Sequence, residues 1–369
     1  MGSSRRPGRA SSTLRLLVYT QSREFGGAEQ ALGYLLGALA PEISVGVLCT
    51  TGAVGEALAA CRTGVPVILA TPPSGLRDRR ALAEHVRAVR RFAPGILHAN
   101  QAWPWDCAYG ELAGMLTPGV RVLAVDHLAL DSPVPRRRRI GRQLLARRLD
   151  AHVAVGERAA RMIERFVGLP PDSVTSVPNG VPSTTPQPLP SPAAGPIVGS
   201  LGRLVEQKGF DLLIRALPRL PGATLVLVGD GPQRDTLVAL AESLGVSDRL
   251  LITGWSREAR RYLPTFDIFA LPSRWEGMPL SILEAMHAGL PVLAADVASV
   301  SEVVLDGETG FVVAPEDQDA ICDRLQRLLG DASLRARMGE RGRARAAERF
   351  TDLVMAARYE DIYSALTSA

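Results

Sequence analysis

The fold of this chain is indicated by Leu14-Arg-Leu-Leu-Val-Tyr-Thr20, followed by Phe25-Gly-Gly-Ala-Glu-Gln30. The first stretch is an apolar run of strand length, and the second joins a glycine turn to a helical pattern that continues through Leu39. This layout places backbone N–H groups beside a bound phosphate, and Gly26 and Gly27 permit close approach because they lack a Cβ. Since many such turns carry glycine for geometry alone, the rest of the chain must support the interpretation.

The same alternation continues along the chain. Strands are predicted near residues 44–48, 66–69, 95–99, 121–125, 151–155 and 174–177, and again near 196–201, 223–228, 250–253, 266–271, 291–294 and 311–313. Helical patterns lie at 78–92, 157–166, 210–217, 233–244, 318–329, 333–348 and 352–366. Alternating strands and helices indicate parallel sheets with helices on both faces and ligands beyond the carboxyl ends of the strands. The predicted fold class is therefore α/β with doubly wound domains.

The length of 369 residues suggests two domains. Asn179-Gly180 marks a turn, and the Pro-, Ser- and Thr-rich residues 182–195 read as an extended linker. We expect an N-terminal domain at 13–181 and a C-terminal domain at 196–350. The last amphipathic segment, 351–369, is expected to return to the N-terminal domain.

The composition excludes several classes of protein. Aromatic residues make up 5% of the chain and do not alternate with basic ones, which argues against nucleic-acid binding. The four cysteines lack the paired spacing of a zinc site or a disulfide framework, so we expect a reducing, cytoplasmic compartment. No apolar core of about 7–15 residues follows the Gly/Ser/Arg-rich start as in a secretory signal, and no apolar run is long enough for a transmembrane helix.

A dense basic patch runs from Arg136 to Arg148 and contains Arg136-Arg-Arg-Arg139, Arg142 and Arg147. It could make a weak contact with the anionic inner face of a membrane or with an acidic substrate. A solvated helix face is the more common origin of such a cluster, particularly in a chain that uses arginine for nearly all its positive charge.

Two carboxylates stand out in Ser273-Arg-Trp-Glu-Gly-Met-Pro-Leu-Ser-Ile-Leu-Glu-Ala-Met-His287. Proline suits the first turn of a helix, so we expect a helix from about Pro279, with Glu276 in the preceding loop. Glu284 would then lie roughly 7–8 Å along the helix axis, and the N–H groups at the helix start would suit a phosphate. An equally weighted alternative is an exposed Glu276 and a Glu284 paired with an arginine.

Two cations follow the predicted strand at 196–201. Arg203 and Lys208 lie in a loop after Gly202, and Lys208 is the single lysine of the chain. Two cations beside a helix start form a good diphosphate site, although a solvent-exposed lysine would explain Lys208 equally simply. Two further glycine turns, at Gly229 and Gly254, follow the next strands and are either nucleotide contacts or plain turns.

Two histidines close strands of the first half. His98 ends one strand and His127 follows the next, at the edge where ligands bind in such sheets. Each is more often a hydrogen-bonded structural residue than a catalytic one, and of the two we favour His127 for a functional role.

Taken together, these residues resemble the retaining glycosyltransferases of family 4, which have the GT-B fold of two Rossmann-like domains facing a central cleft. The matching pieces are Gly26-Gly27-Ala28-Glu29, His127, Asn179-Gly180-Val181, Gly202-Arg203 with Lys208-Gly209, Val228-Gly229-Asp230-Gly231-Pro232, and Glu276 with Glu284 after seven intervening residues. They occur in the order and spacing of that family, from about Leu14 to the C-terminal helix.

The resemblance implies a site for a nucleotide-sugar donor, held mainly by the C-terminal domain, with no bound metal and no cofactor. Arg203 and Lys208 would neutralise the departing diphosphate, Glu284 would accept the ribose hydroxyls, and Glu276 would face the sugar. The remaining implied contacts are His127 at the sugar, Gly27 near the phosphates, and the backbone of Gly277, Met278 and Leu280 at sugar and phosphate.

Met278 and Pro279 depart from the family pattern, which often has an aromatic and a small residue there, so the sugar stays open. The acceptor could be a lipid, a polysaccharide or a natural product, and we expect residues 100–105, with Trp103 and Trp105, to shape its pocket. Two alternatives are a nucleotide-sugar epimerase of the same fold and a nucleotide-sugar-binding protein without activity.

Overall fold

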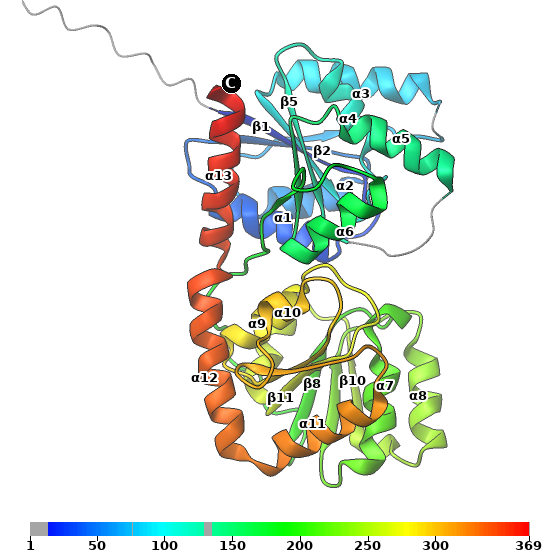
Figure 1. Ribbon diagram of the computed structural model, residues 1–369, viewed down its shortest axis with the longest axis vertical. Helices are drawn as coiled ribbons and strands as arrows, with labels where there is room; N and C mark the ends of the chain where they lie inside the picture. Colours follow the sequence, from blue (N-terminus) through cyan, green and yellow to red (C-terminus); the bar gives the residue numbers. More distant parts are fainter. Residues whose placement is uncertain (1–13, 76, 129–134, 369) are drawn as a thin grey trace, which may run out of the picture.

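The computed structural model describes residues 14–75, 77–128 and 135–368, which form two lobes stacked along the long axis of the molecule (Figure 1). Each lobe is built around one parallel sheet, of seven strands in the first lobe and six in the second. The predicted α/β class with two doubly wound sheets is confirmed. The predicted first residue of the N-terminal domain, residue 13, and the predicted last residue of the C-terminal segment, Ala369, lie outside the described residues.

The first lobe has the sheet order β3-β2-β1-β4-β5-β6-β7. Its strands are β1 (Arg15–Thr20), β2 (Ser44–Cys49), β3 (Val67–Leu69), β4 (Ile96–Gln101), β5 (Arg121–Asp126), β6 (Ala151–Ala154) and β7 (Thr175–Ser176). Its helices are α1 (Gly27–Ala38), α2 (Gly52–Ala59), α3 (Arg79–Phe92), α4 (Ala108–Met115), α5 (Arg136–Ala146) and α6 (Glu157–Val167). The strand order reverses between β1 and β4, so ligands are expected beyond the ends of these two strands.

The second lobe has the sheet order β10-β9-β8-β11-β12-β13. Its strands are β8 (Ile197–Leu201), β9 (Thr224–Val228), β10 (Leu250–Gly254), β11 (Ile268–Leu271), β12 (Val292–Ala295) and β13 (Gly310–Val313). The helices after β8 are α7 (Phe210–Ala216), α8 (Arg234–Ser243), α9 (Leu280–His287), α10 (Val300–Val303), α11 (Gln318–Gly330), α12 (Ala332–Arg349) and α13 (Asp352–Ser368). Short 3-10 turns are η1 (Glu206–Lys208), η2 (Leu217–Arg219), η3 (Ser247–Arg249) and η4 (Ala259–Thr265). Here the order reverses between β8 and β11.

Local boundaries differ from the predicted ones by one or two residues. Helix α9 begins at Leu280, because Pro279 is the N-cap and keeps an extended backbone (φ −69°, ψ 123°). Strand β11 begins at Ile268 rather than near residue 266, because Phe266 closes the 3-10 turn η4. The four-residue helix α10 was not predicted, since it is too short to show a periodic pattern.

The chain crosses between the lobes twice, and the two crossings lie side by side. The N–H of Val181 donates to the carbonyl of Phe350 at 3.0 Å, and that of Asp352 donates to the carbonyl of Val181 at 3.1 Å. A Cβ on Gly180 would lie 2.1 Å from the carbonyl oxygen of Thr351, so this close approach requires glycine.

Helix α13 then runs along the first lobe beside α1, after α12 has followed the second (Figure 1). The carboxylate of Glu360 accepts a hydrogen bond from the N–H of Ala40 at 2.7 Å. The Pro-rich stretch after residue 181 lies along η4, because Arg260 donates to the carbonyls of Pro182 and Thr184 at 2.8 and 3.1 Å.

The basic patch on α5 is smaller than the sequence predicted. Arg136 to Arg139 are exposed, but Arg142 is only 2% exposed and donates to both carboxylate oxygens of Glu111, at 2.8 and 2.6 Å. The inclusion of Arg142 in the surface patch was wrong, because its guanidinium is buried against the carboxylate of Glu111 in α4. In the described part of the chain, no helix is both long and apolar enough to cross a membrane.

Candidate active site

Three of the predicted glycines meet at the carboxyl edge of the second sheet. A Cβ on Gly229 would lie 1.9 Å from the carbonyl oxygen of Gly202, and Gly229 has a φ of 152°, so only glycine fits there. Gly254 forms an isolated bridge with Gly229. The ends of β8, β9 and β10 are therefore brought into close backbone contact.

Lys208 and Glu276 form an ion pair beside this glycine cluster. The Nζ of Lys208 lies 2.5 Å from Oε1 of Glu276, and the hydroxyl of Ser273 donates to the same oxygen at 2.8 Å. Glu276 is 5% exposed, so the alternative of an exposed Glu276 is wrong. The lysine stem passes Gly202, where a Cβ would lie 3.6 Å from Cε of Lys208. The predicted cation and carboxylate thus share one buried site.

Arg203 lies beside the glycine turn of the first lobe. Its guanidinium pairs with Glu24 at 2.9 Å, and both side chains are largely exposed. Helix α1 begins directly after this point, with Gly26 as N-cap and Glu29 accepting from the N–H of Gly26 at 3.2 Å. A Cβ on Gly27 would meet no atom within 4 Å, so open space adjoins this residue.

His127 is held in one orientation by Asn100. The ring Nε2 lies 2.8 Å from Oδ1 of Asn100, whose amide nitrogen donates to the carbonyl of Ala28 at 3.2 Å. Since the amide oxygen faces the ring, Nε2 carries the proton and Nδ1 is left as an acceptor. Burial lowers the pKa of His127 to about 4, although the neighbouring Asp126 opposes this shift. His127 is therefore neutral at pH 7.

The loop before α9 packs against the first lobe. A Cβ on Gly277 would lie 1.8 Å from the carbonyl oxygen of His127. The amide of Asn179 donates to the carbonyl of Met278 at 2.9 Å, and the Met278 side chain is buried. Leu280, the first residue of α9, is half-buried. The predicted donor loop is thus the place where the lobes touch.

Glu284 is enclosed by groups from both lobes. It is 9% exposed, and the phenol of Tyr34 in α1 donates to its Oε1 at 2.9 Å. Arg260 approaches the same oxygen with Nε at 3.7 Å, which is too long for a hydrogen bond. Burial raises the pKa of Glu284, while Arg260 and Tyr34 oppose that rise. Glu284 therefore has Arg260 at ion-pair distance, while its hydrogen bond comes from Tyr34.

His98 lines one small cavity together with Asn100 and His127. It is buried, and its Nδ1 lies 2.7 Å from the hydroxyl of Tyr363, so it links β4 to α13. The two tryptophans lie elsewhere. The indole of Trp105 donates to the carbonyl of Arg138 at 3.4 Å, and Trp103 is 38% exposed.

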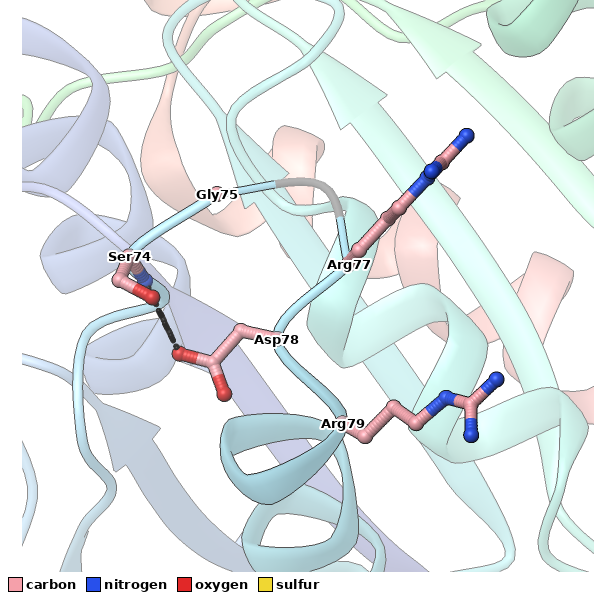
Figure 2. Close-up of a pocket in the computed structure, with 5 residues that line it drawn as sticks. All are labelled: Ser74, Gly75, Arg77, Asp78 and Arg79. Atoms are coloured by element: carbon pink, nitrogen blue, oxygen red, sulfur yellow. Dashed lines mark hydrogen bonds between the residues drawn. The ribbon is translucent and has the colours of Figure 1, made fainter.

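An open hollow of about 550 Å³ adjoins the N-terminus of α3 and is lined by Ser74, Gly75, Arg77, Asp78 and Arg79. In Figure 2 both arginines point away from the hydrogen bond between Ser74 and Asp78, which measures 2.7 Å. The hollow shares no residue with the predicted site.

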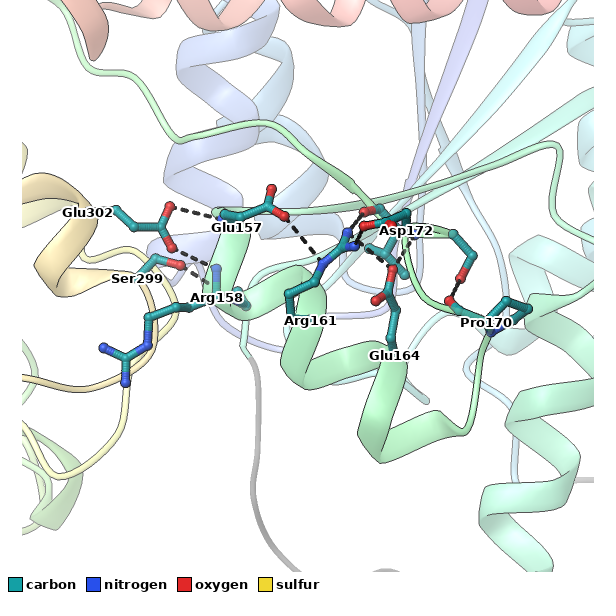
Figure 3. Close-up of polar contacts among 11 residues, drawn as sticks. Glu157, Arg158, Arg161, Glu164, Pro170, Asp172, Ser299 and Glu302 are labelled. Atoms are coloured by element: carbon teal, nitrogen blue, oxygen red, sulfur yellow. Dashed lines mark hydrogen bonds and ion pairs between the residues drawn. The ribbon is translucent and has the colours of Figure 1, made fainter.

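The sequence missed a polar contact between the lobes at α6 (Figure 3). The carboxylate of Glu302 accepts from the N–H groups of Glu157 and Arg158, at 2.9 and 2.7 Å, and Ser299 accepts from Ala159 at 3.3 Å. The N-cap of α6 is Gly156, which has no side chain to serve these groups. In the sequence, the glycine before α6 indicates that the start of this helix lacks a local cap. It does not indicate which distant residue provides the cap.

Within the described residues, no group of three or more His, Cys, Asp and Glu side chains is placed to hold a metal ion.

Two family models match the chain. One, described as Glycosyltransferase Family 4, covers residues 25–184, and the other, described as Glycosyl transferases group 1, covers residues 183–345.

Curated relatives match part of the chain. The lipopolysaccharide core biosynthesis glycosyltransferase LpsE of Rhizobium meliloti (strain 1021) is 40% identical over 146 residues, which are 40% of this chain and 43% of that protein. The GDP-mannose-dependent alpha-(1-6)-phosphatidylinositol monomannoside mannosyltransferase of Mycolicibacterium smegmatis is 38% identical over 181 residues, or 46% of this chain and 47% of that protein. The chain spans just under half the length of these two relatives.

Solved structures match nearly all of the chain. Anabaena Alr3699/HepE in complex with UDP-glucose has a TM-score of 0.83 at 23% identity, covering 95% of this chain and 100% of that chain. Sucrose-phosphate synthase from Thermosynechococcus elongatus has a TM-score of 0.78 at 19% identity, covering 96% and 99%. At these identities the likeness shows the shared fold alone. With the two family models spanning both lobes of this fold, the chain belongs to glycosyltransferase family 4 and has the two Rossmann-like domains of the GT-B fold.

Proposed function

We propose that the chain is a retaining glycosyltransferase, which moves a sugar from a nucleotide-sugar donor to an acceptor hydroxyl without a bound metal or cofactor. The observation that carries the proposal is the ion pair between the half-buried Lys208, in the loop after β8, and the buried Glu276, in the lobe whose donor loop touches His127. Relatives support a nucleotide-sugar donor, since HepE was solved with UDP-glucose and the Mycolicibacterium relative depends on GDP-mannose.

In the proposed reaction, the bond between the anomeric carbon and the diphosphate oxygen breaks, and the diphosphate leaves with the bonding electrons. The acceptor oxygen bonds to the anomeric carbon on the same face, and its proton passes to the departing diphosphate. Arg203 and Lys208 stabilise the charge that develops on the leaving group. Because an ammonium has three N–H groups, Lys208 can hold Glu276 with one and phosphate oxygens with the others.

Groups other than the two cations would hold the sugar and the nucleotide. The unprotonated Nδ1 of His127 would accept a sugar hydroxyl, and Glu276 would face the same sugar. The backbones of the remaining predicted residues would line the diphosphate and nucleoside. They are Gly26, Gly27, Gly202, Gly229, Gly254, Gly277, Met278 and Leu280.

The acceptor would be a lipid, a polysaccharide or a small natural product in the cytoplasm. The exposed residues Arg136 to Arg139 on α5 would supply a weak contact with an anionic membrane face. Sedimentation with vesicles containing phosphatidylglycerol should pull down the protein, and replacing these four arginines with serine should abolish the effect.

A thermal-shift screen tests the donor proposal directly. UDP, GDP, ADP and their sugars should be compared, because a ligand that binds the folded state alone raises the unfolding temperature by mass action. The best donor, in which the sugar is α-linked, should then be turned over with and without EDTA. NMR should show an α-linked product in both cases. An inverted product, or loss of turnover in EDTA, would refute the corresponding part of the proposal.

A further inference from the structure

The carboxylate proposed to bind ribose has a partner that belongs to the other lobe. Tyr34 lies two turns into α1 of the first lobe, and its hydroxyl donates to Oε1 of Glu284 in α9 of the second lobe at 2.9 Å. Tyr34 is itself half-buried, so the hydrogen bond is shielded from water. A contact of this kind forms only when the two lobes are close together.

Arg260 approaches the same oxygen of this carboxylate at ion-pair distance. Its Nε lies 3.7 Å from Oε1 of Glu284, while its Nη2 donates to the carbonyls of Pro182 and Thr184. Because these carbonyls belong to the stretch that joins the lobes, the position of the guanidinium depends on the path of that stretch. Glu284 therefore contacts the first lobe through Tyr34 and the connection between lobes through Arg260.

The second oxygen of Glu284 is left for another donor. Among the described residues, no hydrogen bond reaches Oε2, and the side chain keeps 10% of its surface exposed. A carboxylate accepts about four hydrogen bonds, so one phenol on Oε1 leaves capacity for hydroxyl donors. The hydrogen bond from Tyr34 therefore sets the rotation of the Glu284 carboxylate. This rotation determines the direction of Oε2.

We propose that Tyr34 is a positioning residue for nucleotide binding: it holds Oε1 of Glu284 so that Oε2 receives a ribose hydroxyl. This inference rests on the proposed function, in which Glu284 binds the ribose. Since Tyr34 and Glu284 belong to different lobes, the ribose is bound most tightly in the closed arrangement. Nucleotide binding and closure of the lobes are therefore coupled through this one phenol.

The test compares a ribose with a sugar that lacks its hydroxyls. Binding of UDP, GDP and their 2′,3′-dideoxy forms is measured by calorimetry for wild type, Tyr34→Phe and Glu284→Ala. Tyr34→Phe should weaken UDP or GDP binding about fivefold, on the scale of one net hydrogen bond, and change binding of the dideoxy form less than twofold. A role in folding alone would weaken both forms equally.

Tyr109→Phe is the matched control, since its hydroxyl accepts from the N–H of Asp78 at 2.8 Å within the first lobe. It should leave all four nucleotides unaffected. Equal weakening of ribose and dideoxy forms in Tyr34→Phe, unchanged binding, or tighter binding would each overturn the inference. If Glu284→Ala discriminates between the two forms as strongly as wild type does, the ribose role of Glu284 itself fails, and the inference fails with it.

Discussion

The carboxyl edges of the two sheets present different chemistry where the lobes meet. The edge of the first sheet offers an oriented amide, Asn100, and a neutral imidazole, His127, beside the glycine turn before α1. The edge of the second sheet offers the Lys208–Glu276 pair and the buried carboxylate of Glu284. Both sheets share one doubly wound design, so the difference comes from side chains on their loops rather than from topology.

In the proposed reaction, the two lobes would hold separate parts of the nucleotide sugar. The second lobe would supply cations for the diphosphate, and the first lobe would add the neutral hydrogen-bonding groups of Asn100 and His127 at the sugar. Arg203 links the two edges, because it belongs to the second lobe but pairs with Glu24 of the first. Changes to the charged edge should therefore have the largest effects on turnover.

Lys208→Ala should lower turnover by about 10²–10³-fold, because it removes a preorganised charge from the departing diphosphate. It also leaves Glu276 buried without its cation. Arg203→Ala should cost about 10²-fold, since its guanidinium is more exposed to water. The measurement is steady-state turnover with the donor identified by thermal shift.

Arg215→Ala is the control for these variants, because it removes an exposed positive charge from α7 in the same lobe. It should keep turnover within twofold of wild type. Full activity in either Lys208→Ala or Arg203→Ala would show that the diphosphate does not bind at this edge.

Gly277→Ala should separate the two edges while keeping the side chains of Lys208, Glu276 and His127. The new Cβ would lie 1.8 Å from the carbonyl oxygen of His127, so the lobes must move apart. Misplacement on the scale of 1 Å can cost about 10²-fold in rate, and we expect a loss of about 10- to 10²-fold in kcat/KM. Small-angle scattering with saturating nucleotide should show a larger radius of gyration than wild type.

The control is Gly330→Ala at the end of α11, where a Cβ would meet no atom within 4 Å. It should leave both activity and scattering unchanged. Normal kcat/KM in Gly277→Ala would mean that the contact between Gly277 and His127 is not needed for catalysis.

How well the sequence predicts these features depends on where the interacting residues lie. Lys208 and Glu276 were predicted as site residues, because each follows a strand of the same sheet and strand ends converge. The helix start at Leu280 was predicted within one residue, because proline restricts the backbone there.

Partners that come from another element could not be predicted in the same way. Tyr34 is 250 residues from Glu284, and only the packing of the two lobes brings them together. Arg142 sits in a run of arginines, and the run alone does not show which member meets Glu111 inside the lobe. Pairing across elements depends on distances that residue type and local spacing do not encode.

Glu302→Gln should weaken closure at the contact between α10 and the start of α6. Its carboxylate caps two N–H groups at the start of α6, and loss of the charge should cost about 1 kcal/mol. An energy of that size changes an equilibrium constant about fivefold. The fraction of closed protein should therefore fall by up to fivefold, and the apparent Kd for nucleotide should rise by the same factor. Calorimetry and single-molecule FRET between the lobes measure these two quantities.

Asp317→Asn is the matched control, because Asp317 caps α11 within the second lobe through the N–H of Ala320 at 2.9 Å. It should lower thermal stability without changing nucleotide affinity. If both variants change affinity equally, the Glu302 cap acts on stability rather than on closure.

The smallest effect concerns the buried imidazole of His98 in the first sheet and its dependence on pH. Burial, followed by the nearby His127, lowers the pKa of His98 to about 3, against about 6.5 for an unfolded chain. As the pH falls from 7 to 6, the unfolded state takes up a proton that the folded state cannot, so stability is lost. The loss from His98 alone is about 0.7 kcal/mol over that interval.

Urea unfolding at pH 7 and pH 6 measures this loss for wild type and for His98→Gln, which keeps an amide to meet the hydroxyl of Tyr363. The wild type should lose about 0.7 kcal/mol more than the variant between the two pH values, because the other histidines titrate in both proteins. An equal loss in both proteins would mean that His98 accepts a proton in the folded state. The edge of the first sheet would then carry charge near neutral pH, and its contrast with the second sheet would not hold.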